Sequence, residues 1–296
     1  MKDRKQHVIK MAHQLFIDKG FQATSIQDIL DYSGIAKGTF YNYFSSKNEL
    51  LIALFTTLYK QMEKERNELL IGQDPSDIEI FIKQMELQLE MNRSNNLTAL
   101  FEEVYVSNDE ELKQFIKIGS FKSLRWLYER FVAIFGEDKK PYLLDCASMF
   151  MGILSHMLKN YSIAVKSPHA IHLVVRYSVN RIAKIIEEVS QSGEQLLEPE
   201  LLDAWSPNGK KNNQAFQQAL HRIILNLKKP FTQNIGSKKQ VELLDFIYEE
   251  LINRQEPRLY LIDSVLDTLK KEPQLKRTAG MQKLEKFINE YVKNEK

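Results

Sequence analysis

The sequence has few of the residues that break helices and almost none that cross-link a fold. Its 296 residues include 11 glycines, 8 prolines and a single cysteine, Cys146. One cysteine excludes an internal disulfide framework and fits a protein of the reducing cytosol. The scarcity of glycine and proline, together with a lack of alternating β-branched runs, predicts an all-α fold.

Long apolar runs are also missing. The most apolar stretch, residues 147–158, is short and contains His156, so we expect no segment that spans a bilayer and no membrane partner. Residues 1–10 are charged and no apolar stretch follows them, so we expect no signal peptide and a cytoplasmic location. No glycine-rich phosphate loop, HExxH or GxSxG motif occurs. We therefore expect neither enzymatic activity nor a cofactor.

Basic and acidic side chains nearly balance over the whole chain, whose net charge is +2, but they are unevenly distributed along it. Residues 206–296 contain 17 basic and 11 acidic side chains, a balance of +6, whereas residues 1–205 are slightly acidic. Residues 1–50 carry +2, which is sufficient for a dimer that presents two copies of this end to DNA.

The most informative stretch of the sequence is residues 24–50. Ser25 and Asp28 are three apart at the start of an apolar helical pattern, which predicts a capping box. Gly34 follows as the residue that ends this helix in a left-handed conformation. A second short helix is expected over residues 36–44. Two short helices joined by a tight turn are typical of the helix–turn–helix, whose second helix enters the DNA major groove.

The aromatic residues of the second helix divide between two faces. Phe40 and Phe44 are four apart and share one face. Tyr41 and Tyr43 cannot both face the core with them, which argues against a plain helical hairpin with all aromatics buried. We therefore expect the polar side chains of this helix to be available for phosphates and base edges.

This stretch resembles the tetracycline-repressor (TetR) family of bacterial transcription regulators. The resemblance covers roughly the first fifty residues and has no gap. Leu30 departs from it, because the family usually has a small alanine there, and looser helix packing is the expected cost. The matching residues are Thr24, Ser25, Ile26, Asp28, Ile29, Ser33, Gly34, Ile35, Ala36, Gly38, Thr39, Phe40, Tyr41, Tyr43, Phe44, Lys47, Glu49 and Leu50.

The resemblance implies a homodimeric regulator that reads a palindromic double-stranded DNA operator, usually as a repressor released by a small-molecule effector. Lys37 and Asn42 are the preferred base readers, since lysine favours guanine and asparagine adenine. Lys2, Arg4 and Lys5 either touch phosphate or form a solvated helix end. The expected DNA-binding residues are Thr24, Lys37, Thr39, Tyr41, Asn42, Tyr43 and Lys47, with Thr24 and Lys47 placed at the phosphate backbone.

Four parts of the chain are expected. They are a helix–turn–helix domain over 1–46, an effector-binding and dimerisation body over 47–192, a linker over 193–209, and an additional helical module over 210–296. The helix over 47–70 connects the DNA-binding head to the body. The effector-pocket candidates, each open to an ordinary core or surface role, are Phe101, Tyr105, Phe121, Arg125, Trp126 and Phe150. The expected dimer interface comprises Met149, Ile153, Met157, Val175, Val179 and Ile182.

Two alternatives remain open. His169 and His172 are three apart, and with His156 from a neighbouring helix they would make a metal sensor, although surface histidines fit as well. The module over 210–296 either docks a partner, adds to the dimer or makes a second nucleic-acid contact. Its basic residues are scattered among acids, which favours assembly or docking.

Overall fold

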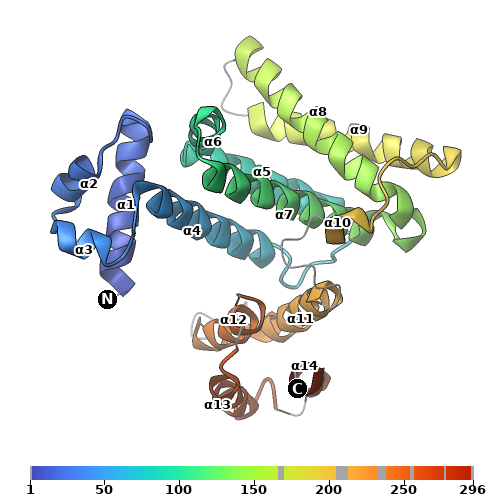
Figure 1. Cartoon of the computed structure of the whole chain (residues 1–296). Helices are drawn as coiled ribbons and strands as arrows, with labels where there is room; N and C mark the ends of the chain where they lie inside the picture. The colour runs from blue at the N-terminus through green and yellow to red at the C-terminus, as the bar shows by residue number, and fades with distance from the viewer. Residues whose placement is uncertain are drawn as a thin grey trace. The chain divides into compact units, whose positions relative to one another are not determined.

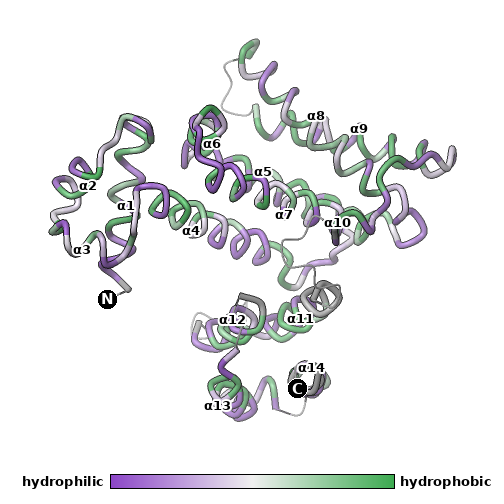
Figure 2. Tube along the Cα trace, in the orientation of Figure 1, coloured by the Kyte–Doolittle hydropathy of each residue, from purple (hydrophilic) through white to green (hydrophobic). Residues whose placement is uncertain are grey.

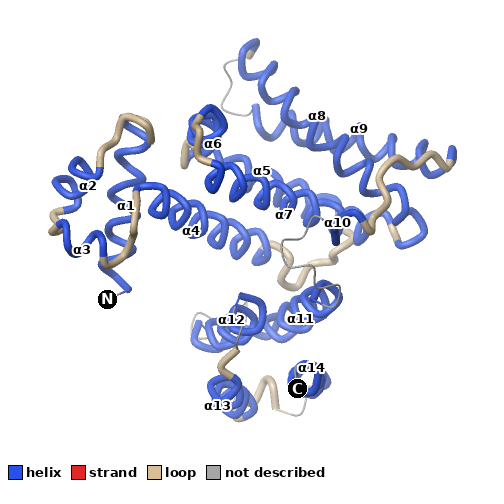
Figure 3. The backbone as a smooth tube through the Cα atoms, in the orientation of Figure 1, coloured by secondary structure: helices blue, strands red, loops and turns tan. Residues whose placement is uncertain are grey.

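The structure is a computed structural model, and it confirms the all-α fold. It describes residues 2–165, 170–204, 213–231, 238–253, 257–276 and 278–294. Over these ranges the backbone forms helices joined by loops, and no strand occurs in them (Figure 3).

The helices follow the periodic apolar segments of the sequence. They are α1 (Lys2–Lys19), α2 (Ile26–Ser33), α3 (Lys37–Tyr41), α4 (Lys47–Glu68), α5 (Ile78–Ser94), α6 (Leu97–Val106), α7 (Glu110–Phe135), η1 (Glu137–Tyr142), α8 (Leu143–Ala164), α9 (Ala170–Ser192), α10 (Leu201–Ala204), α11 (Asn213–Lys228), η2 (Lys229–Phe231), α12 (Lys238–Asn253), α13 (Leu259–Lys270) and α14 (Ala279–Asn294).

The chain divides into two compact units. One comprises Met1–Leu69 and Pro75–Asn208, and the other Leu70–Asp74 and Gly209–Lys296. Within the first unit, α1, α2 and α3 form the head, α4 leads away from it, and α8 and α9 lie side by side (Figure 1). Hydrophobic and hydrophilic segments alternate along the helices, as expected of amphipathic helices that bury one face (Figure 2).

The first hydrophobic core of this unit extends from the head into the helices that follow it. Phe16, Phe40 and Phe44 of the head belong to the same buried cluster as Leu54 on α4 and Leu100 on α6. The cluster also reaches the first turns of α7. Residue 46 was the expected limit of the DNA-binding domain, and the apolar packing runs across it. The head is therefore joined to α4 and α6 by a shared core.

The second core of the first unit lies among α5, α7, α8 and α9. Its largest buried side chains include Phe81, Phe131 and Phe150, whose rings meet pairwise at 5.6 to 5.9 Å between centroids. Tilted and edge-on ring pairs of this kind add to the stabilisation that burial gives.

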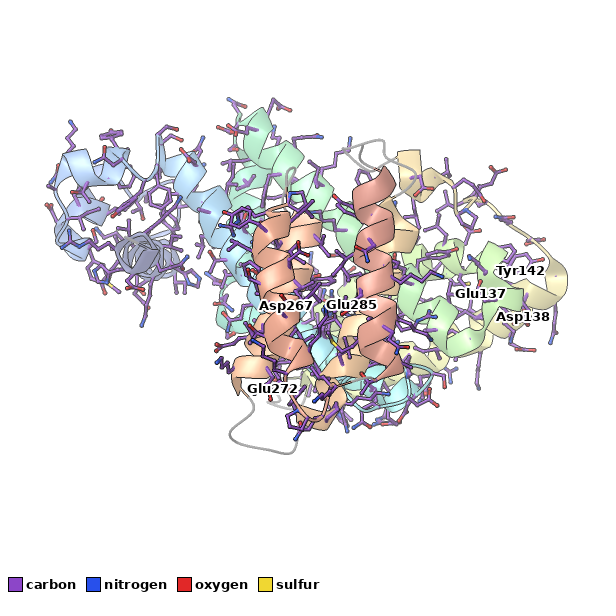
Figure 4. The ribbon with its side chains drawn as sticks, turned by 90° about the horizontal axis from the view of Figure 1, so that it is seen from below. Glu137, Asp138, Tyr142, Asp267, Glu272 and Glu285 are labelled. Carbon is purple, nitrogen blue, oxygen red and sulfur yellow. The ribbon has the colours of Figure 1, made fainter. Side chains whose placement is uncertain are left out.

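The second unit has a core of its own, built by α11 to α14 around Leu244, Ile247 and Leu284. At its surface, Lys270 contacts Asp267 at 3.5 Å and Glu285 at 2.8 Å, which links α13 to α14 (Figure 4). A separate apolar core is the property of a module that folds as its own unit.

Candidate functional site

The first helix of the candidate DNA reader is fixed by local hydrogen bonds. Ser25 Oγ accepts from the Asp28 amide at 3.1 Å, and Asp28 accepts from the Ser25 amide at 2.8 Å, which confirms the predicted capping box. Hydrogen bonds from Ser25 and the ammonium of Lys19 hold the pKa of Asp28 well below its usual range. Gly34 has φ of +66° and donates to Leu30, as predicted for the helix end.

The recognition helix α3 is held by its phenylalanines. Phe40 and Phe44 are both buried, with ring centroids 5.7 Å apart, and Tyr41 meets Phe40 edge-on at 5.4 Å. The helix ends at Tyr41 rather than at residue 44, because Asn42 and Tyr43 form a turn in which the Tyr43 amide bonds to the Phe40 carbonyl. Burial of two large rings fixes the rotation of this short helix about its axis.

The side chains opposite these rings face solvent. Lys37, Tyr41 and Asn42 are exposed, while Thr39 and Tyr43 are half-buried. Tyr41 retains 46% of its accessible surface although it is aromatic. Exposed tyrosine, amide and ammonium groups on this short helix and in the turn after it can hydrogen-bond to DNA phosphates and base edges.

Thr24 and Lys47 point inward instead. Thr24 is buried, and its hydroxyl donates to the Gly20 carbonyl at 2.7 Å. The Lys47 ammonium donates to the carbonyls of Phe21 and Thr24, each at 2.7 Å, and lies 4.4 Å from the centre of the Phe21 ring. Partial burial lowers the pKa of Lys47. Both side chains therefore hydrogen-bond to the segment that leads into α2.

The comparisons with known proteins match this end of the chain. The family described as bacterial regulatory proteins, tetR family, matches residues 8–54, which span most of α1, then α2, α3 and the start of α4. Residues 8–54 are therefore a DNA-binding head of the TetR family. The chain is accordingly a DNA-binding regulator with a helix–turn–helix head.

Relatives of this protein differ in how much of the chain they cover. The uncharacterized HTH-type transcriptional regulator YerO of Bacillus subtilis is 26% identical over 279 residues, which cover 91% of this chain and 90% of YerO. YuxN, from the same organism and also named an uncharacterized HTH-type regulator, is 28% identical over 52% of this chain and 53% of its own. The repressor KstR2 of Mycolicibacterium smegmatis is 35% identical over 48 residues, or 16% of this chain and 23% of its own. No solved structure matches the chain.

The regulator has a small cavity in its body, between α5, α7 and α8. Its volume is about 40 Å³, room for a few water molecules. Two of the predicted pocket residues, Trp126 and Phe150, line it. The complete lining is Met85, Gln88, Ser123, Trp126, Leu127, Phe150, Met151 and Leu154.

The other predicted pocket residues lie elsewhere. Phe101 packs on Phe55 in the first core, and Tyr105 is 57% exposed. Phe121 lies beneath the Lys117 ammonium, and Arg125 donates to the Leu202 carbonyl and to Asp203. Composition alone suggested these positions, and it does not report which helix face meets a cavity.

Sequence reasoning named Arg130 as a possible polar contact of the pocket but missed Gln84, Gln88 and Arg66, with which it forms a polar group beside the cavity. A signal for one of them was present. Arg66 stands four residues after Met62, at the end of the apolar stripe of α4, so a basic residue occupies a core position.

The predicted dimer-interface residues fall into two groups. Met149 and Met157 on α8 are 39% and 41% exposed, and Ile153 between them is half-buried. Val175, Val179 and Ile182 on α9 are buried in the second core of their own chain. The α9 positions therefore pack against α8 and its neighbours within one protomer, and a second copy would contact other side chains of α9.

The histidines of the metal-sensor alternative do not gather in the described part of the chain. His169 lies outside the described residues, His156 is exposed, and His172 Nδ1 lies 2.7 Å from Glu86. No group of three or more metal-ligating side chains occurs among the residues that the structure describes. Likewise, no described helix is long and apolar enough to cross a membrane.

Proposed function

We propose that this TetR-family regulator is a homodimeric cytoplasmic repressor that binds a palindromic operator and is released by a small-molecule effector. The observation that carries the proposal is the first core, which joins the buried face of α3 to α4 and α6 of the body. A change of packing in the body is thereby transmitted to the helix that presents Lys37, Tyr41 and Asn42.

The DNA contacts are assigned to α3. Lys37 and Tyr41 are exposed on this helix and Asn42 is exposed in the turn after it, while Thr39 and Tyr43 are half-buried. Thr24 and Lys47 are left out of the direct contacts because their polar atoms already bond to carbonyls of the preceding turn. Most contacts of this kind position the protein, and one or two base contacts specify the sequence.

The second copy is assigned to the outer faces of α8 and α9. These helices expose Met149, Met151, Met157, Leu173 and Tyr177, which is more large apolar surface than single scattered residues provide. Two copies related by a two-fold axis present two recognition helices to successive major grooves. Light scattering that gives a monomer at micromolar concentration would contradict this assignment.

The effector acts by preferring the conformation that does not fit the operator. A preference of about 1–3 kcal/mol between the two conformations gives on the order of 5–150-fold release. The cavity between α5, α7 and α8 is the assigned entry point, since two of the aromatic side chains predicted for the pocket line it.

The test is a footprint of the purified protein on the DNA upstream of its own gene and of the neighbouring genes. A protected site with two-fold symmetry is the expected result. An unprotected region, from folded and dimeric protein at low salt, counts against a repressor that binds its operator unaided.

A further inference from the structure

Residues 194–204, which fall within the expected linker, contact the helices of the body. They follow Gly193, where α9 ends with a φ of +74° and a hydrogen bond from its amide to the Val189 carbonyl at 3.0 Å. We call this segment the strap. The structure describes all of it, and its only helix is the single turn of α10. Its position therefore depends on a few contacts with the helices beside it.

The first part of the strap is held by α8. Asp145, in the first turn of α8, is buried, and its two carboxylate oxygens accept from the amides of Leu196 and Leu197 at 2.7 and 3.0 Å. The side chain of Leu197 packs against the second core, whereas that of Leu196 is 85% exposed. Hydrogen bonds to a charged acceptor are roughly twice as strong as those between neutral groups. One carboxylate thus anchors two consecutive amides of the strap.

The last part of the strap is held by α7. Leu202 of α10 is 3% exposed and belongs to the second core. Arg125 of α7 donates to the Leu202 carbonyl, and one of its terminal nitrogens lies 3.4 Å from the Asp203 carboxylate. The strap is therefore bonded to α8 near its beginning and to α7 near its end.

The docked strap lies near a buried polar group that has no hydrogen bond. Tyr128 of α7 is 6% exposed, and its hydroxyl has no partner in the described part of the chain. Burial raises the pKa of Tyr128 to about 12, and the negative charges of Glu137 and Glu200 act in the same direction. Glu200 belongs to the strap. Because an unsatisfied buried hydroxyl is costly, release of the strap would gain free energy where it admits water to this group.

The helix that holds the end of the strap also reaches the head. Asp109 caps the start of α7 by accepting from the Leu112 amide at 2.8 Å, and it also accepts from the side-chain amide of Asn48 in the first turn of α4. Leu112 lies in the first core with the buried rings of the head. One continuous helix joins these contacts to Arg125, about 24 Å away. A displacement of α7 at the strap is therefore carried to α4 and the head.

We propose that the strap is a regulatory element, which fixes α7 while it is docked and thereby favours operator binding. A head that α7 and the shared core hold in one orientation has less freedom to lose when it binds DNA. Residues 209–296 follow the strap in the chain, so the strap is a covalent connection through which the second unit can act on α7. The proposal rests on the operator binding proposed above, and it is independent of the effector and of the cavity.

The first test uses the wild-type protein. Hydrogen exchange of the Leu196 and Leu197 amides reports opening of the strap, because Asp145 accepts from both. Coupling between two sites is reciprocal, so bound operator should slow this exchange by about fivefold or more, and a non-operator duplex of the same length should not. Equal exchange rates with and without bound operator overturn the proposal.

A pair of variants tests the strap directly. Leu202→Asn places an amide in the second core and should release the strap, which lowers the protection of the Leu196 and Leu197 amides by about tenfold or more. Operator affinity should then fall by about fivefold or more. Leu196→Asn makes the same change at the exposed position and should keep both quantities within about twofold of the wild type. A released strap with wild-type operator affinity contradicts the proposal.

A measurement without DNA separates this proposal from the function on which it rests. Leu202→Asn should also lower the protection of the Leu112 amide at the start of α7, and Leu196→Asn should leave it unchanged. Unchanged protection of Leu112 in a folded Leu202→Asn protein means that the strap is only a local closure of the second core. A Leu112 response in a protein that protects no operator rejects the DNA function and supports the coupling. Where Leu202→Asn does not fold, the wild-type comparison decides, since it needs no variant.

Discussion

Tyr41 is the residue on which the DNA-binding proposal depends most directly. It is exposed on α3 and rests edge-on against the buried ring of Phe40. Tyr41→Ala should weaken operator binding more than tenfold, because it removes an exposed aromatic and hydroxyl contact without opening the core. Binding is measured by titration of a labelled operator, and folding by circular dichroism.

The matched control for this change is Tyr260→Ala, which removes an exposed tyrosine from α13. It should leave operator affinity within twofold of the wild type. Tyr41→Ala that binds as tightly as this control would remove Tyr41 from the interface.

Lys47 should behave as a structural residue. Its ammonium donates to the carbonyls of Phe21 and Thr24, so Lys47→Met leaves these acceptors without their charged donor. A hydrogen bond to a charged group contributes about 1.5–3 kcal/mol, and we expect the free energy of unfolding to fall by about that amount. Urea denaturation measures it.

Lys37→Met is the comparison for this change, since Lys37 is exposed on α3. It should keep the wild-type stability and bind the operator more weakly. The opposite result for Lys47→Met would be unchanged stability together with a smaller salt dependence of operator affinity, by about one unit of slope. That result would show that Lys47 contacts a phosphate of the DNA backbone.

These residues mark what the sequence could predict. Ser25, Asp28 and Gly34 act on backbone groups within a few positions of themselves, so spacing alone identified the capping box and the helix end. Lys47 bonds to carbonyls more than twenty positions earlier, and its direction depends on how α1 and α4 pack. Arg66 is a similar case, because periodicity places it on the buried face of α4 but does not name its partners.

At the scale of elements, Glu103 of α6 makes a hydrogen bond to the head. Its carboxylate accepts from the Gln22 amide at 2.8 Å, and its charge raises the pKa of Lys47 against the effect of burial. His13 of α1 makes a second link, with a ring nitrogen 3.1 Å from the Asn95 carbonyl just before α6. These polar contacts run beside the shared apolar core and tie the turn before α2 to the body.

Glu103→Ala should therefore loosen this turn selectively. Loss of a charged acceptor worth about 1.5 kcal/mol or more should speed hydrogen exchange of the Gln22 amide at least tenfold. Glu102→Ala, at the exposed neighbouring position, should leave the exchange rate unchanged. Equal rates in the two variants would mean that the apolar core alone couples α6 to the head.

The buried faces of the helices were predictable and their packing partners were not. The apolar repeat in α9 is strong, but it is compatible with packing against either the same chain or a second copy. Val175, Val179 and Ile182 were expected at the dimer interface and lie in the second core of one chain. A repeat of 3.6 identifies the buried face of a helix and leaves its partner unspecified.

At the scale of the whole molecule, the second unit is the part for which the family offers least guidance. The alignment with YerO covers 91% of the chain and must therefore extend well into this unit. Several of its basic side chains are engaged within it: Lys228 pairs with Asp245, Arg258 with Glu250, and Lys270 with Glu285. These three basic side chains are therefore less available to DNA, although the surplus of positive charge in the segment is unchanged by such pairs.

Deletion of the second unit distinguishes its possible roles. Because its basic residues are scattered among acids and do not form a cluster, a chain ending near residue 206 should keep the wild-type dependence of operator affinity on salt concentration. We expect the deletion instead to weaken self-association or the capture of a partner, since α11 to α14 form a core of their own. Operator titration at several salt concentrations and light scattering measure the two effects. A smaller salt slope with an intact dimer would assign phosphate binding to this unit, because the slope falls by close to one unit for each phosphate that the protein no longer neutralises.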